Sequence, residues 1–133
     1  MNRINSFGGV FLQAQDPAKL AGWYTQHFGL EFSLDGDFYW MEFFYRNDDD
    51  PSLRQNTVFS IMPAQQPLGD ERREYIINYR VNDLAGLLEQ LQAHGVALQP
   101  VKEQLDGRFP GSKGLFTTIR DLEGNQLELY QPI

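Results

Sequence analysis

Apolar and polar residues alternate along several short segments of this chain, and each alternation predicts a β-strand with two different faces. In the last of them, Leu127 and Leu129 fall on the face opposite Glu128. This segment follows Asp-Leu-Glu-Gly-Asn at 121–125, whose Asp, Gly and Asn favour a tight turn. Other strands are predicted over 8–15, 30–34, 38–45, 57–62, 75–81, 96–104 and 115–120, with a loop over 106–113.

Two further segments repeat their apolar residues at helical spacing and carry capping signals at both ends. The first helix is predicted over 17–28, after Asp16 as N-cap and before Gly29 as a left-handed C-cap. The second begins after Asp83, repeats leucines at i, i+3, i+4 and i+7, and ends at Gly95. Both helices therefore present one apolar stripe to the rest of the fold.

The same order of elements, a strand, an Asp-capped helix and three strands, occurs twice along the chain. Asp16 and Asp83 are separated by almost the same interval as Gly29 and Gly95. A half of this kind needs a second half to complete it, within one chain or between two. We predict an α+β fold in which two βαβββ modules form a curved eight-stranded mixed sheet around a cleft. We expect a single domain over 1–133, with module one at about 4–63, a linker at 64–74 and module two at 75–133.

Composition limits the partners of the protein. The 133 residues carry a formal charge of −7 and no long basic stretch, which argues against binding to nucleic acid or an anionic membrane. The absence of cysteine excludes disulfides, thiolate metal sites and a cysteine nucleophile. The first residues lack the apolar core of a signal peptide, so we expect a cytoplasmic protein.

The segments resemble, in order, the vicinal oxygen chelate superfamily, which includes glyoxalase I, extradiol dioxygenases and bleomycin-resistance proteins. The resemblance covers nearly the whole chain. It lies in Gly-Val-Phe-Leu-Gln-Ala-Gln-Asp at 9–16, Trp23-Tyr24 with Phe28-Gly29-Leu30, Val81-Asn82-Asp83-Leu84, and Asp-Leu-Glu-Gly-Asn at 121–125 followed by Leu-Glu-Leu at 127–129 and Pro132. The terminal motif is the most specific part, with Leu122 where the family usually has Pro. The resemblance implies the two-module fold and a homodimer.

Metal enzymes of this superfamily hold a divalent ion on the concave sheet face. The resemblance places their ligand positions at Gly9, Ser60, Ile76 and Glu128. Only Glu128 carries a usual ligand, whereas a metal centre needs several strong nitrogen or oxygen donors. His27 and His94 fall in the last turns of the two predicted helices, where the helix dipole favours a cation. We therefore expect no cofactor, with a weak divalent-metal site at Glu128 as the alternative.

Alternation also assigns side chains to the face that would line the cleft. We expect ligand contacts from Phe11, Gln13, Trp40, Ser60, Asn78, Arg80 and Tyr130. Glu128 is the candidate catalytic residue, although an ion pair with Arg80 or Arg120 would make it structural. The aromatic strand over 38–45 adds walls to this cleft, with its inward face left open by the sequence. An apolar cleft with a few polar groups is the usual form of a small-molecule pocket.

Two classes of function follow. The first is a protein that binds a small organic molecule without a metal, as bleomycin-resistance proteins do, and this reading is favoured by the missing ligands. The alternative is an enzyme of the same superfamily, a lyase, isomerase or dioxygenase that uses Glu128 with or without a metal. A carboxylate in an apolar cleft has its pKa raised towards a range useful for a general base. Whether the protein is an enzyme is not decided by the sequence.

Overall fold

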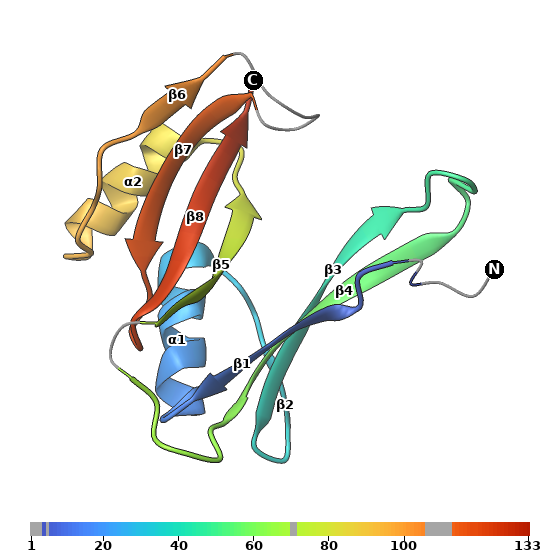
Figure 1. Ribbon diagram of the computed structural model, residues 1–133, viewed down its shortest axis with the longest axis vertical. Helices are drawn as coiled ribbons and strands as arrows, with labels where there is room; N and C mark the ends of the chain where they lie inside the picture. The colour runs from blue at the N-terminus through green and yellow to red at the C-terminus, as the bar shows by residue number, and fades with distance from the viewer. Residues whose placement is uncertain (1–3, 5, 70–71, 106–112) are drawn as a thin grey trace. The chain divides into compact units, whose positions relative to one another are not determined.

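The computed structural model describes residue 4 and residues 6–69, 72–105 and 113–133 of the chain, and for 72–74 only the backbone. The chain divides into two compact units after Leu68, a position inside the segment predicted as a linker. Each unit contains one four-stranded mixed sheet and one helix (Figure 1). Residues 106–112 of the predicted loop lie outside the described residues.

The first unit repeats the predicted order of strand, helix and three strands. Its elements are β1 (Gly9–Ala14), α1 (Pro17–Phe28), β2 (Ser33–Asp35), β3 (Phe38–Arg46) and β4 (Arg54–Pro63). The strand order is β1-β4-β3-β2, with β1 parallel to β4 and the other neighbours antiparallel. Helix α1 lies against one face of this sheet, so the other face is free of helix (Figure 1).

The ends and the buried stripe of α1 follow the sequence signals. The Asp16 carboxylate accepts a hydrogen bond from the Lys19 amide (3.1 Å), and Gly29 ends the helix with φ of 68°. Tyr24 is fully buried, and its ring packs edge-on against Phe59 of β4 at 5.4 Å between centroids. The tyrosine thus joins helix and sheet in one core.

The last turn of α1 contains a buried histidine. His27 lies in the last turn of α1, as expected, but it is 5% exposed and packs against the Trp23 ring. Trp23, whose ring packs edge-on against His27, is half-buried.

The second unit has the same order of elements. They are β5 (Arg72–Arg80), α2 (Leu84–Ala93), β6 (Lys102–Gln104), β7 (Gly114–Arg120) and β8 (Asn125–Pro132). The strand order is β5-β8-β7-β6, with β5 parallel to β8. Two such units, with eight strands and two helices among the described residues, confirm the predicted α+β fold.

Two predicted strands are shorter than the sequence indicated. The segment predicted as a strand over 96–104 pairs only at Lys102–Gln104, because its beginning serves the end of α2. The Val96 amide donates to the Leu91 carbonyl and the Gly95 amide to Gln92, which is the Schellman closure of a helix. In the first unit the strand predicted over 30–34 occupies Ser33–Asp35 instead, next to the predicted hairpin turn at Gly36.

In the part of the chain that the structure describes, neither helix is long and apolar enough to cross a membrane.

Candidate functional site

Strand register determines which side chains share the helix-free face of the first sheet. Phe59 and Ile61 of β4 are buried on the α1 side, so Ser60 between them faces the other way. Ser60 is directly opposite Phe11 of β1 and Trp40 of β3. Phe11, Ser60 and Trp40 therefore form one row across three neighbouring strands. The same register puts Phe38, Glu42 and Phe44 on the helix-free face, which the sequence had left open.

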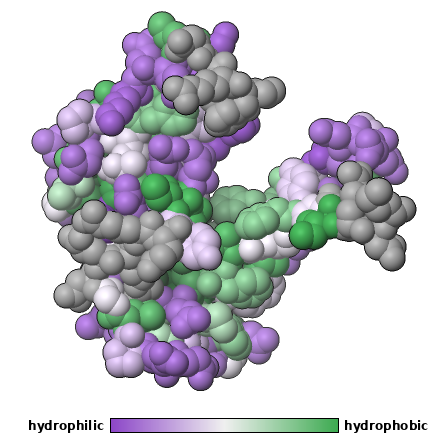
Figure 2. Space-filling view, in the orientation of Figure 1, coloured by the Kyte–Doolittle hydropathy of each residue, from purple (hydrophilic) through white to green (hydrophobic). Residues whose placement is uncertain are grey.

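The aromatic members of this row are presented to solvent. Phe11 is 61% exposed and Trp40 is 36% exposed, whereas Ser60 between them is 2% exposed. Gln13 lies two residues beyond Phe11 on the same face and is also exposed. Four of the predicted ligand-binding residues thus meet on one face of the first unit. Apolar residues line the strands of this unit in Figure 2.

The second sheet separates its faces equally clearly. Leu127 and Leu129 of β8 are 1% and 0% exposed, and α2 packs on this strand. Glu128 between them therefore lies on the helix-free face, as predicted. Asn78 of β5 and Thr118 of β7 are its register partners on the two neighbouring strands.

The Glu128 carboxylate has a defined neighbour. Asn78 donates a hydrogen bond from Nδ2 to Glu128 Oε1 at 2.7 Å. In the described parts of the second unit, Glu128 forms no ion pair with Arg80 or Arg120. The Arg120 guanidinium instead donates to the Gly124 carbonyl at 2.8 Å, within the β7–β8 turn. Glu128 is thus a hydrogen-bonded carboxylate on an open sheet face.

A second row runs across the same face, two residues along the strands. Arg80, Tyr130, Phe116 and Lys102 are register partners on β5, β8, β7 and β6. The Phe116 and Tyr130 rings are stacked, with centroids 4.7 Å apart and planes at 15°. The Arg80 guanidinium carbon lies 5.8 Å from the centre of the Tyr130 ring. Tyr130 itself is 4% exposed, so its neighbours cover most of the ring.

Sequence reasoning missed three residues of this second face. Phe116 and Thr118 alternate with Thr117 and Ile119, and that alternation was available in the sequence. Lys102 could not be placed in the same way, because the strand that carries it was predicted too long.

Among the residues that the structure describes, the donors needed for the divalent metal of the family do not come together. A side chain at Gly9 is obstructed, because a Cβ built there would clash with the Val58 carbonyl oxygen. Ile76 has no donor atom, and Ser60 is buried. Among the described residues, no group of three or more His, Asp or Glu side chains could hold a metal ion. The residues present therefore do not fit the family's metal site.

Comparison with known proteins gives the class of this protein. The model of the Glyoxalase/Bleomycin resistance protein/Dioxygenase superfamily matches residues 3–129, and the chain belongs to this superfamily. No curated protein sequence matches it.

Several solved structures share the fold over almost the whole chain. TnmS3, an antibiotic binding protein from Streptomyces sp. CB03234, is 20% identical, with a TM-score of 0.65 and 100% coverage of both chains. An integron cassette protein from the mobile metagenome of V. cholerae is 13% identical, with a TM-score of 0.68 and 98% coverage of both chains. The fosfomycin resistance protein FosX from Listeria monocytogenes is 15% identical, with a TM-score of 0.58, and the match covers 100% of this chain and 96% of FosX. At these identities the likeness shows the fold.

Proposed function

We propose that this protein binds a small, partly aromatic organic molecule on the helix-free faces of its sheets, without a resident metal. The observation that carries the proposal is the exposed pair Phe11 and Trp40, one on each side of Ser60. Exposed aromatic side chains that share one face are typical of surfaces that bind ligands. An antibiotic binding protein and a fosfomycin resistance protein with the same fold support this choice of ligand class.

Tryptophan fluorescence offers a direct test of this binding. Trp23 and Trp40 are the only two tryptophans, so a Trp23→Phe variant leaves Trp40 as the sole reporter. We expect a panel of small aromatic and antibiotic-like compounds to contain members that saturably quench or blue-shift its emission. Replacing Phe11 by Ala should weaken the binding of such a compound at least roughly tenfold, the loss expected for a buried aromatic contact.

The control for this substitution is Leu34→Ala. Leu34 is 59% exposed on the same sheet, but its register partner Tyr39 lies on the α1 side. It should leave affinity unchanged. Equal losses from the two substitutions would contradict a binding site on the helix-free face.

The metal-independent part of the proposal has its own test. Thermal unfolding is followed with Zn²⁺, Ni²⁺, Mn²⁺ and Fe²⁺, in the wild type and in Glu128→Gln. We expect no metal-specific rise in melting temperature, because a single carboxylate is a weak ligand set. A rise of several degrees that the variant loses would establish a metal site at Glu128 and refute this part.

A second candidate function rests on the hydrogen bond between Asn78 and Glu128. A carboxylate held on an open sheet face, beside the Thr118 hydroxyl group, can act as a general base towards a bound carbonyl compound. The protein would then be a lyase or isomerase. Conversion of a bound ligand by the wild type, lost in Glu128→Gln with binding retained, would favour this enzyme over the binding protein.

A homodimer completes the proposal. The family resemblance described above implies a homodimer. In addition, each unit of this chain leaves one sheet face without a covering helix.

A further inference from the structure

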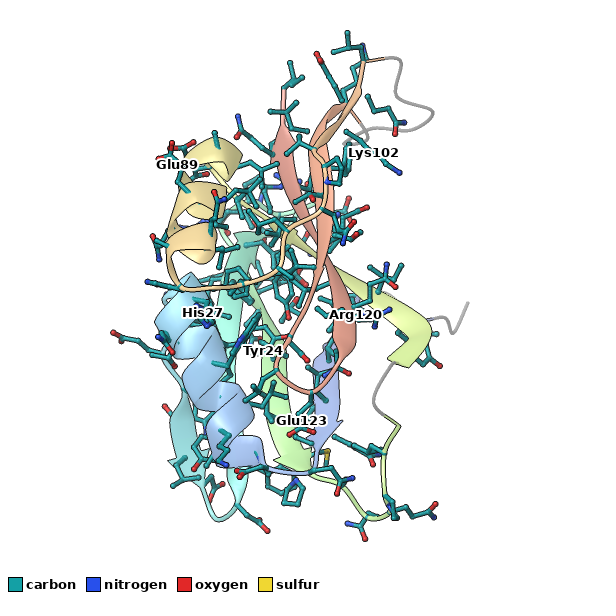
Figure 3. The ribbon with its side chains drawn as sticks, turned by 90° about the vertical axis from the view of Figure 1, so that its left-hand side faces the viewer. Tyr24, His27, Glu89, Lys102, Arg120 and Glu123 are labelled. Carbon is teal, nitrogen blue, oxygen red and sulfur yellow. The ribbon has the colours of Figure 1, made fainter. Side chains whose placement is uncertain are left out.

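The second unit carries a row of four side chains in which two cations flank two stacked aromatic rings. Arg80 stands at one end on β5 and Lys102 at the other end on β6, with Tyr130 and Phe116 between them. All four are register partners, so they share the helix-free face. In Figure 3, Lys102 and Arg120 lie across this sheet from α2, whereas Glu89 points outward from that helix.

The two cations have no acidic partner among the described side chains of this unit. Within residues 75–105 and 113–133, neither the Arg80 guanidinium nor the Lys102 ammonium group forms an ion pair or a hydrogen bond. The chain nevertheless has 18 acidic residues against 11 lysines and arginines. Glu103, next to Lys102, is paired with Leu115 and so lies on the other face. The row is therefore a locally positive strip on an acidic protein.

The position of Arg80 supports recognition of a ligand next to the rings. Its guanidinium carbon is 5.8 Å from the centre of the Tyr130 ring, at the outer limit of a cation–π contact. The group therefore lies near the Tyr130 ring, where an anion bound next to the rings could accept hydrogen bonds from it. Three strand spacings, about 14 Å, separate the backbones of Arg80 and Lys102, and both long side chains can reach inward over this distance.

Glu128 lies outside this row. It is paired with Asn78, two residues before Arg80, which places its backbone about 7 Å along the strand from the row. An anion between Arg80 and Lys102 is thus separated from this carboxylate, and the Glu128 row remains available for a hydrogen-bond donor of the same ligand.

We propose that this row recognises an anionic group, a carboxylate or sulfonate, on an aromatic ligand. Phe116, which is half-buried and stacked on Tyr130, receives the aromatic part. Arg80 and Lys102 bind the anion from the two ends. The inference rests on the proposed function, because it names the ligand class of the same protein and assigns the anion to the second unit.

A matched pair of probes separates the two proposals. 2-Naphthoate and 2-naphthylmethanol share one ring system and differ in charge. Titration by isothermal calorimetry and protein NMR should show 2-naphthoate binding at least roughly tenfold more tightly, the value of one charge-assisted hydrogen bond. Raising the salt concentration should weaken the binding of 2-naphthoate and leave the binding of 2-naphthylmethanol unchanged.

Arg80→Gln and Lys102→Gln should each remove most of the preference for 2-naphthoate. Lys102→Arg should retain it, because the cation is kept. Arg46→Gln, an exposed position in β3 of the first unit, makes the same change in net charge and should have no effect. Circular dichroism checks that each variant is folded.

Equal affinity for the two probes, unaffected by Arg80→Gln and Lys102→Gln, would overturn the anion proposal and leave the binding function standing. If Arg46→Gln reduced the preference for 2-naphthoate as much as Arg80→Gln does, the anion proposal would also be overturned, since net charge alone would then explain the preference. If neither probe bound, both the proposed binding of aromatic ligands and the anion proposal would be overturned.

Discussion

At the scale of single residues, small side chains determine what the helix-free face of the first unit can do. Gly9 is in register with Val58, and the two strands approach so closely that no Cβ fits between them. A metal ligand could not be added there without moving the backbone. Ser60 is small enough to lie beneath Phe11 and Trp40, which stand above it on the neighbouring strands.

The close approach at Gly9 makes a testable difference between two adjacent glycines. Gly9→Ala should lower the free energy of unfolding by about 1–3 kcal/mol, because overpacking against a backbone carbonyl has no easy relief. Gly8→Ala should be nearly neutral, since a Cβ at Gly8 meets nothing within 4 Å. Urea unfolding of both variants gives the comparison. Equal stability of the two would show that β1 and β4 can separate at no cost.

Alternation in the sequence predicted the side on which residues lie better than it predicted their exposure. Leu127 and Leu129 are on the helix side and Glu128 is opposite, as predicted. The burial of Tyr130 was not predictable, because it depends on Phe116 and Arg80, which come from other strands. Register between strands far apart in sequence supplies that information, and a single strand does not contain it.

At the scale of elements, the turn at 121–125 is the most completely specified local structure. Asp121 is 6% exposed, and its carboxylate accepts hydrogen bonds from the Glu123 amide (2.9 Å), the Asn125 amide (3.0 Å) and Asn125 Nδ2 (2.8 Å). The Gly124 amide donates to the Asp121 carbonyl at 3.1 Å, which closes a four-residue turn. The sequence signals of Asp, Gly and Asn describe this turn correctly.

Removal of the Asp121 carboxylate should destabilise the protein strongly. Asp121→Ala leaves several donors of a buried turn without their acceptor, and we expect a loss of about 2 kcal/mol or more in the free energy of unfolding. Asp37→Ala, in the exposed β2–β3 turn, is the control and should cost much less. Chemical denaturation measures both, and a small effect at Asp121 would mean that water replaces the carboxylate.

Leu122 occupies the second position of the same turn, where Pro is favoured. Its side chain is 52% exposed, and its amide makes no hydrogen bond among the described residues. Leu122→Pro should therefore raise the free energy of unfolding by about 0.4–1 kcal/mol, through a less flexible unfolded chain. Glu123→Pro is the contrasting variant, because the Glu123 amide donates to Asp121. A loss of stability in both would show that Asp121 cannot tolerate a following proline.

Elements at the sheet edges were the least predictable. Strand β6 pairs only with Gly114, Leu115 and Phe116, although β7 continues to Arg120. The preceding residues are held differently, through the Thr117 hydroxyl group, which donates to the Gln99 carbonyl at 3.0 Å. Local propensity over 96–104 does not show which of these residues pair with the neighbouring strand and which close α2 or bond to Thr117.

At the scale of the whole molecule, the chain repeats one βαβββ plan and leaves one sheet face of each unit without a covering helix. This repetition was predictable from the sequence, because its capping residues recur at nearly the same interval. The sequence repeat did not predict how aromatic and charged side chains are distributed between the two units. The first unit carries exposed aromatic residues, whereas the second carries the cations and Glu128.

The repeated plan leads to a prediction about assembly. Phe43, Phe44 and Leu53 near the end of the β3–β4 hairpin are 42%, 51% and 50% exposed. Burial of such residues stabilises association, so we expect the protein at micromolar concentration to sediment as a dimer of twice the 15.4 kDa chain mass.

A double variant, Phe43→Glu with Leu53→Glu, should shift the equilibrium to the monomer, since each chain would then bury two charges without partners in the interface. Leu122→Glu, an equally exposed leucine in the β7–β8 turn, is the control and should remain dimeric. A wild-type monomer at the highest concentration tested would contradict the homodimer, and unchanged dimers in both variants would place the interface elsewhere.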